Sequence, residues 1–402
     1  MRIHPKVFLL QLSNFASGLG NSIVMITIPW LILERTDSPA FAGVVVAVSA
    51  LPGLLISPIG GWMVDHLGRR AVSIGADILS SLSVMSFPIV AATIGLSNTS
   101  IMALAFIGAI FDPAGYTARK TLLVDVSKAS KIDQDQLNGI HDGFLGVAWV
   151  FGPAVGAWLI SAVGAINSFW VVAGLFMLAS VAIMILKVDD SGKDARDKLV
   201  ESGLKGNRDL LIGFQVLWRD GLLRTITVSI LILAAVYLPT GSIILPTYFE
   251  KLEDPRGLGL VISALAGGSA ISAFGYGWIS NRFKRRTQVR MTLIGSAISI
   301  IPMSFLPPLP VLIVSAFLLG LSWGPFNPLI STLVQERVPA DQHGRVFGVQ
   351  TAVFYAAPPI GMVLTGLSVE RFGLNDTYLI LALILAVTAV VVLFTKSLRS
   401  NF

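Results

Sequence analysis

Residues 61–70 read GWMVDHLGRR, and residues 277–286 read GWISNRFKRR. Both stretches are short basic turns between long apolar segments, and the second begins 216 positions after the first in a chain of 402 residues. A membrane protein that repeats such a turn half a chain later is predicted to consist of two similar halves, an arrangement common in transporters. The copies differ where charge matters, because Asp65 becomes Asn281 and Gly68 becomes Lys284.

The composition places most of the chain in a membrane. The sequence is 54% hydrophobic and 13% charged, whereas soluble domains have about 25% charged residues. So few charges cannot cover a surface that faces water. The chain has no cysteine, which excludes disulfides and thiolate metal ligands, and its four histidines lack the spacing of a zinc hydrolase. We therefore expect no bound metal and no cofactor.

Twelve apolar runs have the length of membrane-crossing helices. About 20 residues, at a rise of roughly 1.5 Å each, cross the hydrocarbon layer of a bilayer. The first run is too long for a signal peptide and is followed by further runs, so we expect it to be part of the mature protein. The predicted spans are 7–33, 40–62, 71–94, 100–122, 140–163, 166–186, 223–249, 258–280, 287–306, 310–333, 346–367 and 374–393.

The positions of Lys and Arg predict the orientation of the spans. If the N-terminus is cytoplasmic, the outside loops hold only four of the 29 basic residues, namely Arg35, Lys251, Arg256 and Arg371. Cytoplasmic loops of membrane proteins carry the excess of Lys and Arg, so both termini are predicted to be cytoplasmic. The same bias explains the net charge of +6, because basic loops face anionic lipid head groups. We therefore expect no binding to nucleic acid.

The longest polar segment separates six spans from six. The sequence predicts an N-terminal six-helix bundle over residues 1–187, a cytoplasmic linker over 188–222 and a C-terminal six-helix bundle over 223–402. In the linker, Leu210, Phe214 and Leu217 recur at helical spacing, which indicates either a short amphipathic helix at the membrane interface or a simple strut. The predicted fold is an all-α membrane protein whose twelve transmembrane helices form two pseudo-symmetric bundles.

The repeat extends beyond the two turns. Residues 111–113 (FDP) match 326–328 (FNP), residue Pro29 matches Pro246, and residues 153–156 (PAVG) loosely match 358–361 (PPIG). The matches keep the same order and similar offsets, so together they support two halves of six spans each. Again an acid in the first half, Asp112, stands opposite an amide in the second half, Asn327.

Over its whole length the sequence resembles the major facilitator superfamily of transporters. Residues 61–70 resemble the family's signature turn between spans two and three. Residues 111–114 with Asn138, then 338–339 and 344–348, resemble the branch of the macrolide-efflux proteins and the enterobactin exporter. The sequence departs from many of these relatives because the arginine of the mid fourth span is missing and Asp112 lies in that region. A motif of the family's antiporters in the fifth span is matched by Gly143, Gly152, Pro153 and Gly156, although Ala157 replaces its last glycine.

The resemblance also implies a conformational latch at the signature turn. Asp65 is placed to accept hydrogen bonds from a helix N-terminus, where a carboxylate is stabilised. The resemblance suggests that this helix is the eleventh span, which begins near Arg345. The alternative is that the basic residues of the turn only fix the topology. The predicted latch residues are Gly61, Asp65, Gly68, Arg69, Arg70 and Arg345.

Acidic residues inside the membrane are the strongest functional candidates, because they are costly to bury. The proton-coupling candidates are Asp112 in the fourth span, Asp77 in the third and Asp142 near the inner end of the fifth, with a structural role as the alternative for each. Polar and aromatic residues within spans predict the lining of a substrate cavity. These cavity candidates are Asn14, Asn21, Tyr237, Trp323, Asn327, Gln350 and Tyr355.

The sequence therefore predicts a secondary active transporter in the inner (plasma) membrane of a bacterium. We expect proton-coupled efflux of lipophilic or amphiphilic compounds (multidrug, macrolide or siderophore-like) by alternating access. The alternative is a facilitator for lipids or metabolites, or a proton symporter. The expected partners are the substrate, protons and membrane lipid, and the protein is expected to be a monomer. Residues 320–324 (GLSWG) match a hydrolase motif but lie in an apolar span, so no enzyme activity is expected.

Overall fold

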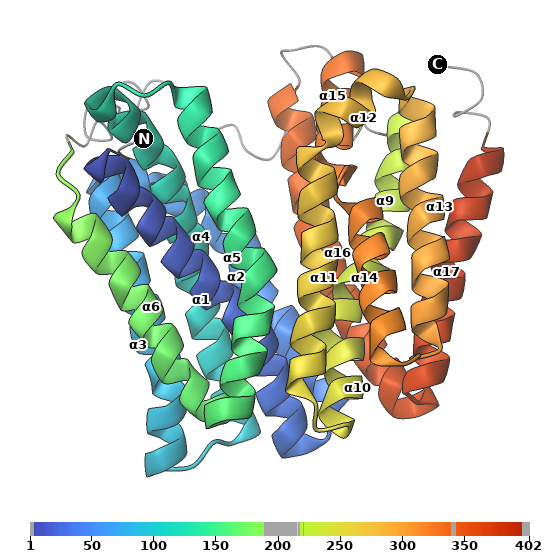
Figure 1. The fold of residues 1–402 in the computed structure, drawn as a ribbon, viewed down its shortest axis with the longest axis horizontal. Coiled ribbons are helices and arrows are strands. Elements are labelled where there is room, and N and C mark those ends of the chain that lie inside the picture. Colours follow the sequence, from blue (N-terminus) through green and yellow to red (C-terminus); the bar gives the residue numbers. More distant parts are fainter. Residues whose placement is uncertain (1–3, 189–214, 216–217, 220, 339–342, 396–402) are drawn as a thin grey trace. The chain divides into compact units, whose positions relative to one another are not determined.

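The structure is a computed structural model that describes residues 4–188, 215, 218–219, 221–338 and 343–395. These residues form helices joined by short turns, and no strand occurs among them (Figure 1). Contacts along the chain divide it into two compact units. Unit 1 comprises Met1–Asp37 and Val45–Gly203, and unit 2 comprises Ser38–Val44 and Leu204–Phe402.

Unit 1 is a bundle of long helices, drawn from blue to green in Figure 1. Within it, α1 packs against α5 and α6, and α3 packs against α4 and α6. The bounds are α1 (Pro5–Thr36), α2 (Pro39–Leu67, whose first residues up to Val44 belong to unit 2), α3 (Arg69–Thr93), α4 (Asn98–Ser130), α5 (Gln134–Val163) and α6 (Ala165–Ile185).

Unit 2 contains more helical elements because several of its long helices are interrupted. A π-helical turn, η1, follows Pro239, and such turns mark local breaks in the regular hydrogen-bond ladder. The bounds are α9 (Gly221–Pro239), η1 (Thr240–Ile244), α10 (Leu245–Lys251), α11 (Pro255–Phe274), α12 (Tyr276–Arg282), α13 (Arg285–Ser304), α14 (Leu309–Trp323), α15 (Phe326–Arg337), α16 (His343–Phe372) and α17 (Leu374–Phe394).

The packing of unit 2 repeats that of unit 1. Here α9 packs against α16 and α17, and α13 packs against α14 and α17. These pairs correspond in chain order to α1 with α5 and α6, and to α3 with α4 and α6. The internal repeat of the sequence is therefore matched by a repeat in helix packing, because corresponding helices of the two units pack against corresponding neighbours.

The described residues contain nine segments that are long and apolar enough to cross a membrane. The remaining predicted spans coincide with α2, α13 and α16, so the count of twelve stays a prediction. The predicted linker at 188–222, with Leu210, Phe214 and Leu217, lies almost wholly outside the described residues. The nine segments are Pro5–Thr36, Arg69–Thr93, Asn98–Ser130, Gln136–Val163, Ala165–Ile185, Leu223–Lys251, Pro255–Phe274, Leu309–Val334 and Leu374–Phe394.

The two basic turns differ in backbone conformation as well as in charge. In the first, Gly68 precedes α3 with φ 93°, a conformation that glycine adopts at little cost and other residues avoid. In the second, Lys284 precedes α13 with φ −60° and ψ 148°, which any residue can adopt. The substitution of lysine for glycine between the two copies is therefore explained by the loss of the left-handed turn.

Candidate functional site

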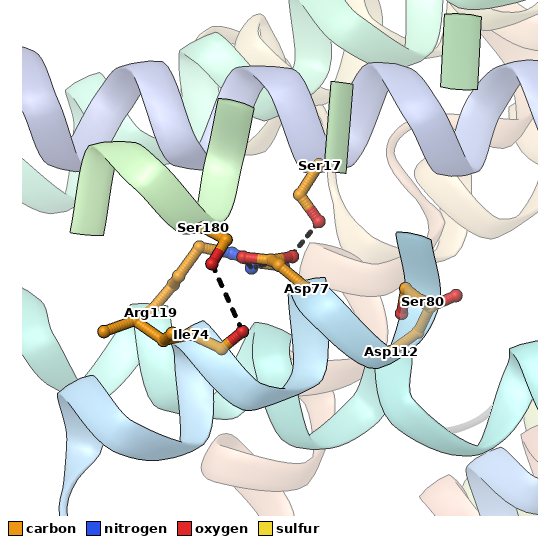
Figure 2. A network of polar contacts seen from close by, with 7 residues as sticks. All are labelled: Ser17, Ile74, Asp77, Ser80, Asp112, Arg119 and Ser180. Atoms are coloured by element: carbon orange, nitrogen blue, oxygen red, sulfur yellow. Dashed lines mark hydrogen bonds and ion pairs between the residues drawn. The ribbon is translucent and has the colours of Figure 1, made fainter. Parts of the chain in front are cut away.

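The most buried charged groups of unit 1 form an ion pair between α3 and α4. Arg119 Nη1 lies 2.9 Å from Asp77 Oδ1 and 2.8 Å from Oδ2, and the two side chains are only 4% and 3% exposed. From α1, Ser17 Oγ accepts a hydrogen bond of 2.9 Å from Arg119 Nη2 (Figure 2). Gly115, one turn before Arg119, lets α4 approach α3, because a Cβ there would lie 3.0 Å from that of Ala76.

Asp112 lies on the same face of α4, about two turns before Arg119. Ser80 Oγ donates to Asp112 Oδ1 at 3.3 Å. Asn21, with its amide nitrogen turned toward the carboxylate, donates to Asp112 Oδ2 at 2.8 Å. Each of α1, α3 and α4 thus contributes two side chains from one face. We call the six residues the acid–arginine cluster: Ser17, Asn21, Asp77, Ser80, Asp112 and Arg119.

A cavity of about 80 Å³ adjoins the Asp112 end of the cluster. Asp112, Asn21 and Ser80 form its polar wall, and apolar residues such as Phe87 and Phe176 form much of the rest. One water molecule needs roughly 10–15 Å³ of cavity volume, together with polar partners for its hydrogen bonds. The cavity can therefore hold a few waters against the Asp112 carboxyl group, but it is too small for a drug-sized compound.

The two acids of the cluster differ in charge compensation. Asp77 is neutralised by a guanidinium that binds both of its oxygens. Asp112 has only uncharged partners, Asn21 and Ser80, and forms no ion pair with any described residue. A charge without a counter-ion inside a membrane protein is costly. Asp112 is therefore the acid of the cluster whose protonation relieves an electrostatic cost.

Asp142, the third coupling candidate, lies apart from the cluster. It pairs with Lys120 at 2.5 Å, and the two side chains are 53% and 37% exposed, as expected of a surface ion pair. The preceding residue, His141, is fully buried and its Nδ1 lies 3.2 Å from Gln11 Oε1. Asn14, a predicted cavity residue, is also buried and donates to the His141 carbonyl at 2.9 Å, so it joins α1 to α5.

The two arginines of the signature turn hold neighbouring helices of unit 1 together. Arg69 Nη1 lies 2.9 Å from the buried Asp125 of α4. Arg70 Nη2 donates to the carbonyl of Met184 at 3.2 Å, near the C-terminus of α6. The surroundings of Gly61 and the side chains of Asp65 and Arg345 lie outside the described part of the chain, so the latch stays a prediction.

The glycines of the antiporter-like motif serve close packing of α5 on α1. A Cβ on Gly152 would collide with Ser22, and one on Gly156 would lie 3.0 Å from Ile26. Pro153 is buried between them. Gly143 differs, because nothing lies within 4 Å of the position that its Cβ would take. The need for close packing is therefore confined to Gly152 and Gly156.

Three aromatic rings stack in unit 2, around two of the predicted cavity residues. The rings of Tyr237 and Trp323 lie 4.3 Å apart at 8°, and those of Trp323 and Phe326 lie 4.8 Å apart at 8°. They come from α9, α14 and α15, and Tyr237 lies three residues before the π-helical turn η1. For the other candidates of unit 2, the side chains lie outside the described part: Asn327, Gln350 and Tyr355.

Arg119 was not among the residues predicted from the sequence, where only the middle of the fourth span was searched for an arginine. Arg119 falls inside the predicted span 100–122 but near its inner end, where a basic residue looks like an ordinary loop anchor. The available signal was its spacing, because a residue seven positions from Asp112 lies on the same helix face. Ser17, Ser80 and His141 were also missed, since a lone small polar residue or histidine in a span gives no distinct signal.

Two stretches of the sequence, residues 10–254 and 240–400, match the family described as the Major Facilitator Superfamily. The chain is 34% identical over 396 residues to multidrug efflux pump Tap of Mycolicibacterium fortuitum, covering 98% of this chain and 96% of that protein. It is 24% identical over 408 residues to macrolide efflux protein A of Streptococcus pyogenes, covering 98% and 96%. The crystal structure of the nucleoside transporter NupG matches with a TM-score of 0.82 at 12% identity, covering all of both chains, which shows a shared fold.

Proposed function

Since this chain belongs to the major facilitator superfamily, we propose that it exports lipophilic or amphiphilic compounds in exchange for protons, by alternating access. Relatives named as multidrug and macrolide efflux proteins, aligned over almost the whole chain, support the export of such compounds. The chain is a transporter of the bacterial inner membrane, not an enzyme. Proton exchange is supported by the acid–arginine cluster of unit 1.

The proposal includes the arrangement of the chain in the membrane. We assign twelve spans, in bundles over residues 1–187 and 223–402 joined by a cytoplasmic linker at 188–222, with both termini in the cytoplasm. The repeated helix packing of the two units supports two bundles of the same design. Only four of the 29 basic residues fall in the predicted outside loops, which supports the orientation. A monomer is the simplest state that contains both bundles.

The observation that carries proton coupling is the uncompensated carboxyl group of Asp112 beside a cavity of about 80 Å³. With Asp77 and Arg119 charged and paired, the net charge of the three groups is −1 when Asp112 is ionised and zero when it is protonated. A cation that approaches the cluster is therefore favoured by the ionised state and disfavoured by the protonated state. Antiport of a cationic amphiphile against a proton requires this competition.

Asn21 is suited to both protonation states of Asp112. Its amide nitrogen donates to an ionised carboxylate, as in the geometry described above. After half a turn of the amide, its oxygen can instead accept from the protonated carboxyl group. Ser80 can likewise donate or accept through its hydroxyl group. The partners of Asp112 therefore remain hydrogen-bonded whether or not the proton is present, which allows reversible exchange.

The test is transport by the purified protein in liposomes under an imposed pH gradient. Ethidium, a fluorescent lipophilic cation, serves as the probe, and an entrapped pH dye reports proton movement. We expect ethidium movement to accelerate with the gradient and to be accompanied by counter-movement of protons. In Asp112→Asn the asparagine side chain has the same size as aspartate and can still form hydrogen bonds, but it cannot ionise. It should abolish the gradient dependence while downhill ethidium exchange continues.

Two control variants separate the acids. Asp376→Asn changes an acid in the first turn of α17 in unit 2 and should transport like the parent. Asp142→Asn changes the surface acid paired with Lys120 and should also remain coupled. If Asp112→Asn keeps gradient-driven transport, Asp112 is structural. If the parent protein itself shows no proton-driven export of ethidium, the runner-up holds, a facilitator or symporter for lipids or metabolites. If Asp142→Asn alone loses coupling, the coupling acid is at the surface site.

The other predicted residues take supporting parts in this proposal. The latch at Gly61, Asp65, Gly68, Arg69, Arg70 and Arg345 would stabilise one of the two access states. Gly152, Pro153 and Gly156 hold α5 against α1, the helix that carries Ser17 and Asn21. The stacked Tyr237 and Trp323 would offer an aromatic wall to the substrate, with Asn327, Gln350 and Tyr355 as further lining residues.

A further inference from the structure

A second cavity, of about 520 Å³, lies in unit 2 along α13, between α12 and α14. Its size falls within the roughly 300–1,000 Å³ typical of small-molecule sites. Most of its lining is apolar and includes Met291, Ile298 and Leu318. Polar groups gather along the first turns of α13, where Thr287 and Arg290 line it. The cavity thus has a long apolar part and one cationic end.

The cavity opens at the surface of unit 2. Three of its apolar lining residues are largely exposed, with Ile298 at 63%, Met291 at 48% and Leu318 at 45%. Beside the groove, α13 also packs against α17. Exposed apolar side chains on a membrane-crossing bundle face acyl chains, because contact with water over such an area is unfavourable. We call this feature the α13 groove.

The cationic end of the groove belongs to a stretch without acids. Residues 255–335 contain no Asp or Glu, and five basic residues lie within positions 282–290. One of them, Arg282, lies over the ring of Trp278 at 5.6 Å, outside the groove.

Arg290, the basic residue of this stretch that lines the groove, is incompletely bonded. It donates to the carbonyl of Leu393 at 3.4 Å through Nη2. Its Nε is buried and has no hydrogen-bond partner among the described residues, and the same holds for Nε of Arg286. Arg290 thus places a guanidinium at one end of the groove, with hydrogen-bonding capacity that no described residue takes up.

We propose that the α13 groove binds an anionic phospholipid of the cytoplasmic leaflet. One acyl chain lies along Met291, Ile298 and Leu318, and the phosphate lies at Arg290 and Thr287. Basic pockets between transmembrane helices on the cytoplasmic side attract anionic head groups, and a phosphate supplies the acceptors that Arg290 lacks. The assignment depends on the cytoplasmic orientation of the basic turn, and it is independent of proton coupling at Asp112.

The test is lipid retention by the purified full-length protein. Phosphatidylglycerol or phosphatidylcholine with the same acyl chains is added at equal concentration, and bound lipid is counted by native mass spectrometry. We expect phosphatidylglycerol to be retained in preference to phosphatidylcholine. Arg290→Gln should weaken this retention about fivefold, the effect of one basic residue on an anionic lipid. Ile298→Trp should reduce it as well, because the indole fills the acyl part of the groove.

Matched controls lie on neighbouring helices of unit 2. Arg256→Gln removes an exposed basic residue of the acid-free stretch that does not line the groove, and Val311→Trp adds an indole at an exposed position of α14 away from it. Both should retain phosphatidylglycerol like the parent. Ile298 is 63% exposed, so its replacement leaves the core intact even if Arg290→Gln unfolds the protein.

Three outcomes would overturn the assignment. Equal retention of the two lipids would show that the groove does not select an anionic head group. Retention unaffected by both groove variants would place the lipid elsewhere. Displacement of phosphatidylglycerol by ethidium in the parent, but not in Ile298→Trp, would show that the groove holds a transported compound instead of a lipid.

Discussion

Breaking the Asp77–Arg119 pair should cost far more stability than breaking the Lys120–Asp142 pair one residue along the chain. Both pairs join a basic residue of α4 to an acid, but the first is 4% and 3% exposed and the second 37% and 53%. Removing one partner of a buried pair leaves an uncompensated charge and costs about 3–5 kcal/mol. An exposed pair contributes only about 0–1 kcal/mol, because water screens both charges.

The expected change in melting temperature follows from these energies. For a unit of roughly 150–250 residues, each kcal/mol shifts the midpoint by about 2–4 °C. Arg119→Gln or Asp77→Asn should therefore lower the apparent Tm by about 6–20 °C. Asp142→Asn should lower it by at most about 4 °C. The assay is thermal unfolding of the detergent-purified protein, followed by tryptophan fluorescence at a fixed heating rate.

The double variant Asp77→Asn/Arg119→Gln makes the comparison decisive. It removes both charges together, so no uncompensated charge is left in the interior. The double variant should therefore be more stable than either single variant, which requires a coupling energy larger than the single losses of about 3–5 kcal/mol. Additive losses in the double variant, or single losses no larger than that of Asp142→Asn, would refute the ion pair as a source of stability.

Two further predictions concern packing and substrate contact. Gly152→Ala should destabilise the protein by about 1–3 kcal/mol, because the added Cβ meets Ser22. Gly143→Ala should be neutral or stabilising, because its Cβ meets nothing and alanine favours a helix. Equal changes in Tm for the two variants would contradict this packing role. Trp323→Leu removes the central ring of the aromatic stack with Tyr237. The KM for ethidium should then rise about 2–10-fold, which corresponds to about 0.5–1.5 kcal/mol per aromatic contact. An unchanged KM would exclude these rings from the substrate path.

Much of the fold could be predicted from the sequence. Apolar runs near the length of a bilayer indicated the helices, and nine of the twelve predicted spans meet the criteria of length and hydropathy in the described residues. The signature turn at 61–70 indicated the family, which the family match confirms. These signals are local, since a run of 20 apolar residues indicates a span, and a ten-residue motif indicates a family, whatever the tertiary contacts of the segment are.

The interruptions of the helices were harder to predict. Residues 223–249 read as one uniform apolar run, but the structure divides the region into α9, η1 and α10. Pro239 marks the break, yet proline is also tolerated within uninterrupted membrane helices such as α1, which contains Pro29. Whether a proline interrupts the helix depends on what the surrounding helices offer to the freed backbone groups, and this information is not local.

The candidate site could be predicted only in part for the same reason. The sequence identified Asp77, Asp112 and Asn21, because polar residues are scarce in spans. It did not reveal that Arg119 neutralises Asp77, 42 positions away, or that Asn21 serves Asp112, 91 positions away. Hydropathy reports how much of a helix is apolar but not which face it turns toward its neighbour.

The sequence by itself determined that this protein lies in a membrane, that its two halves are related, and that its first half carries the embedded acids. These properties follow from composition and local pattern, because the bilayer imposes a length and a polarity on every span. Only the tertiary structure decided which acid keeps an uncompensated charge. Gly115 and Gly152 set how closely α4 approaches α3 and α5 approaches α1. That approach places Arg119 against Asp77 and leaves Asp112 with the neutral Asn21 and Ser80, beside a cavity the size of a few waters.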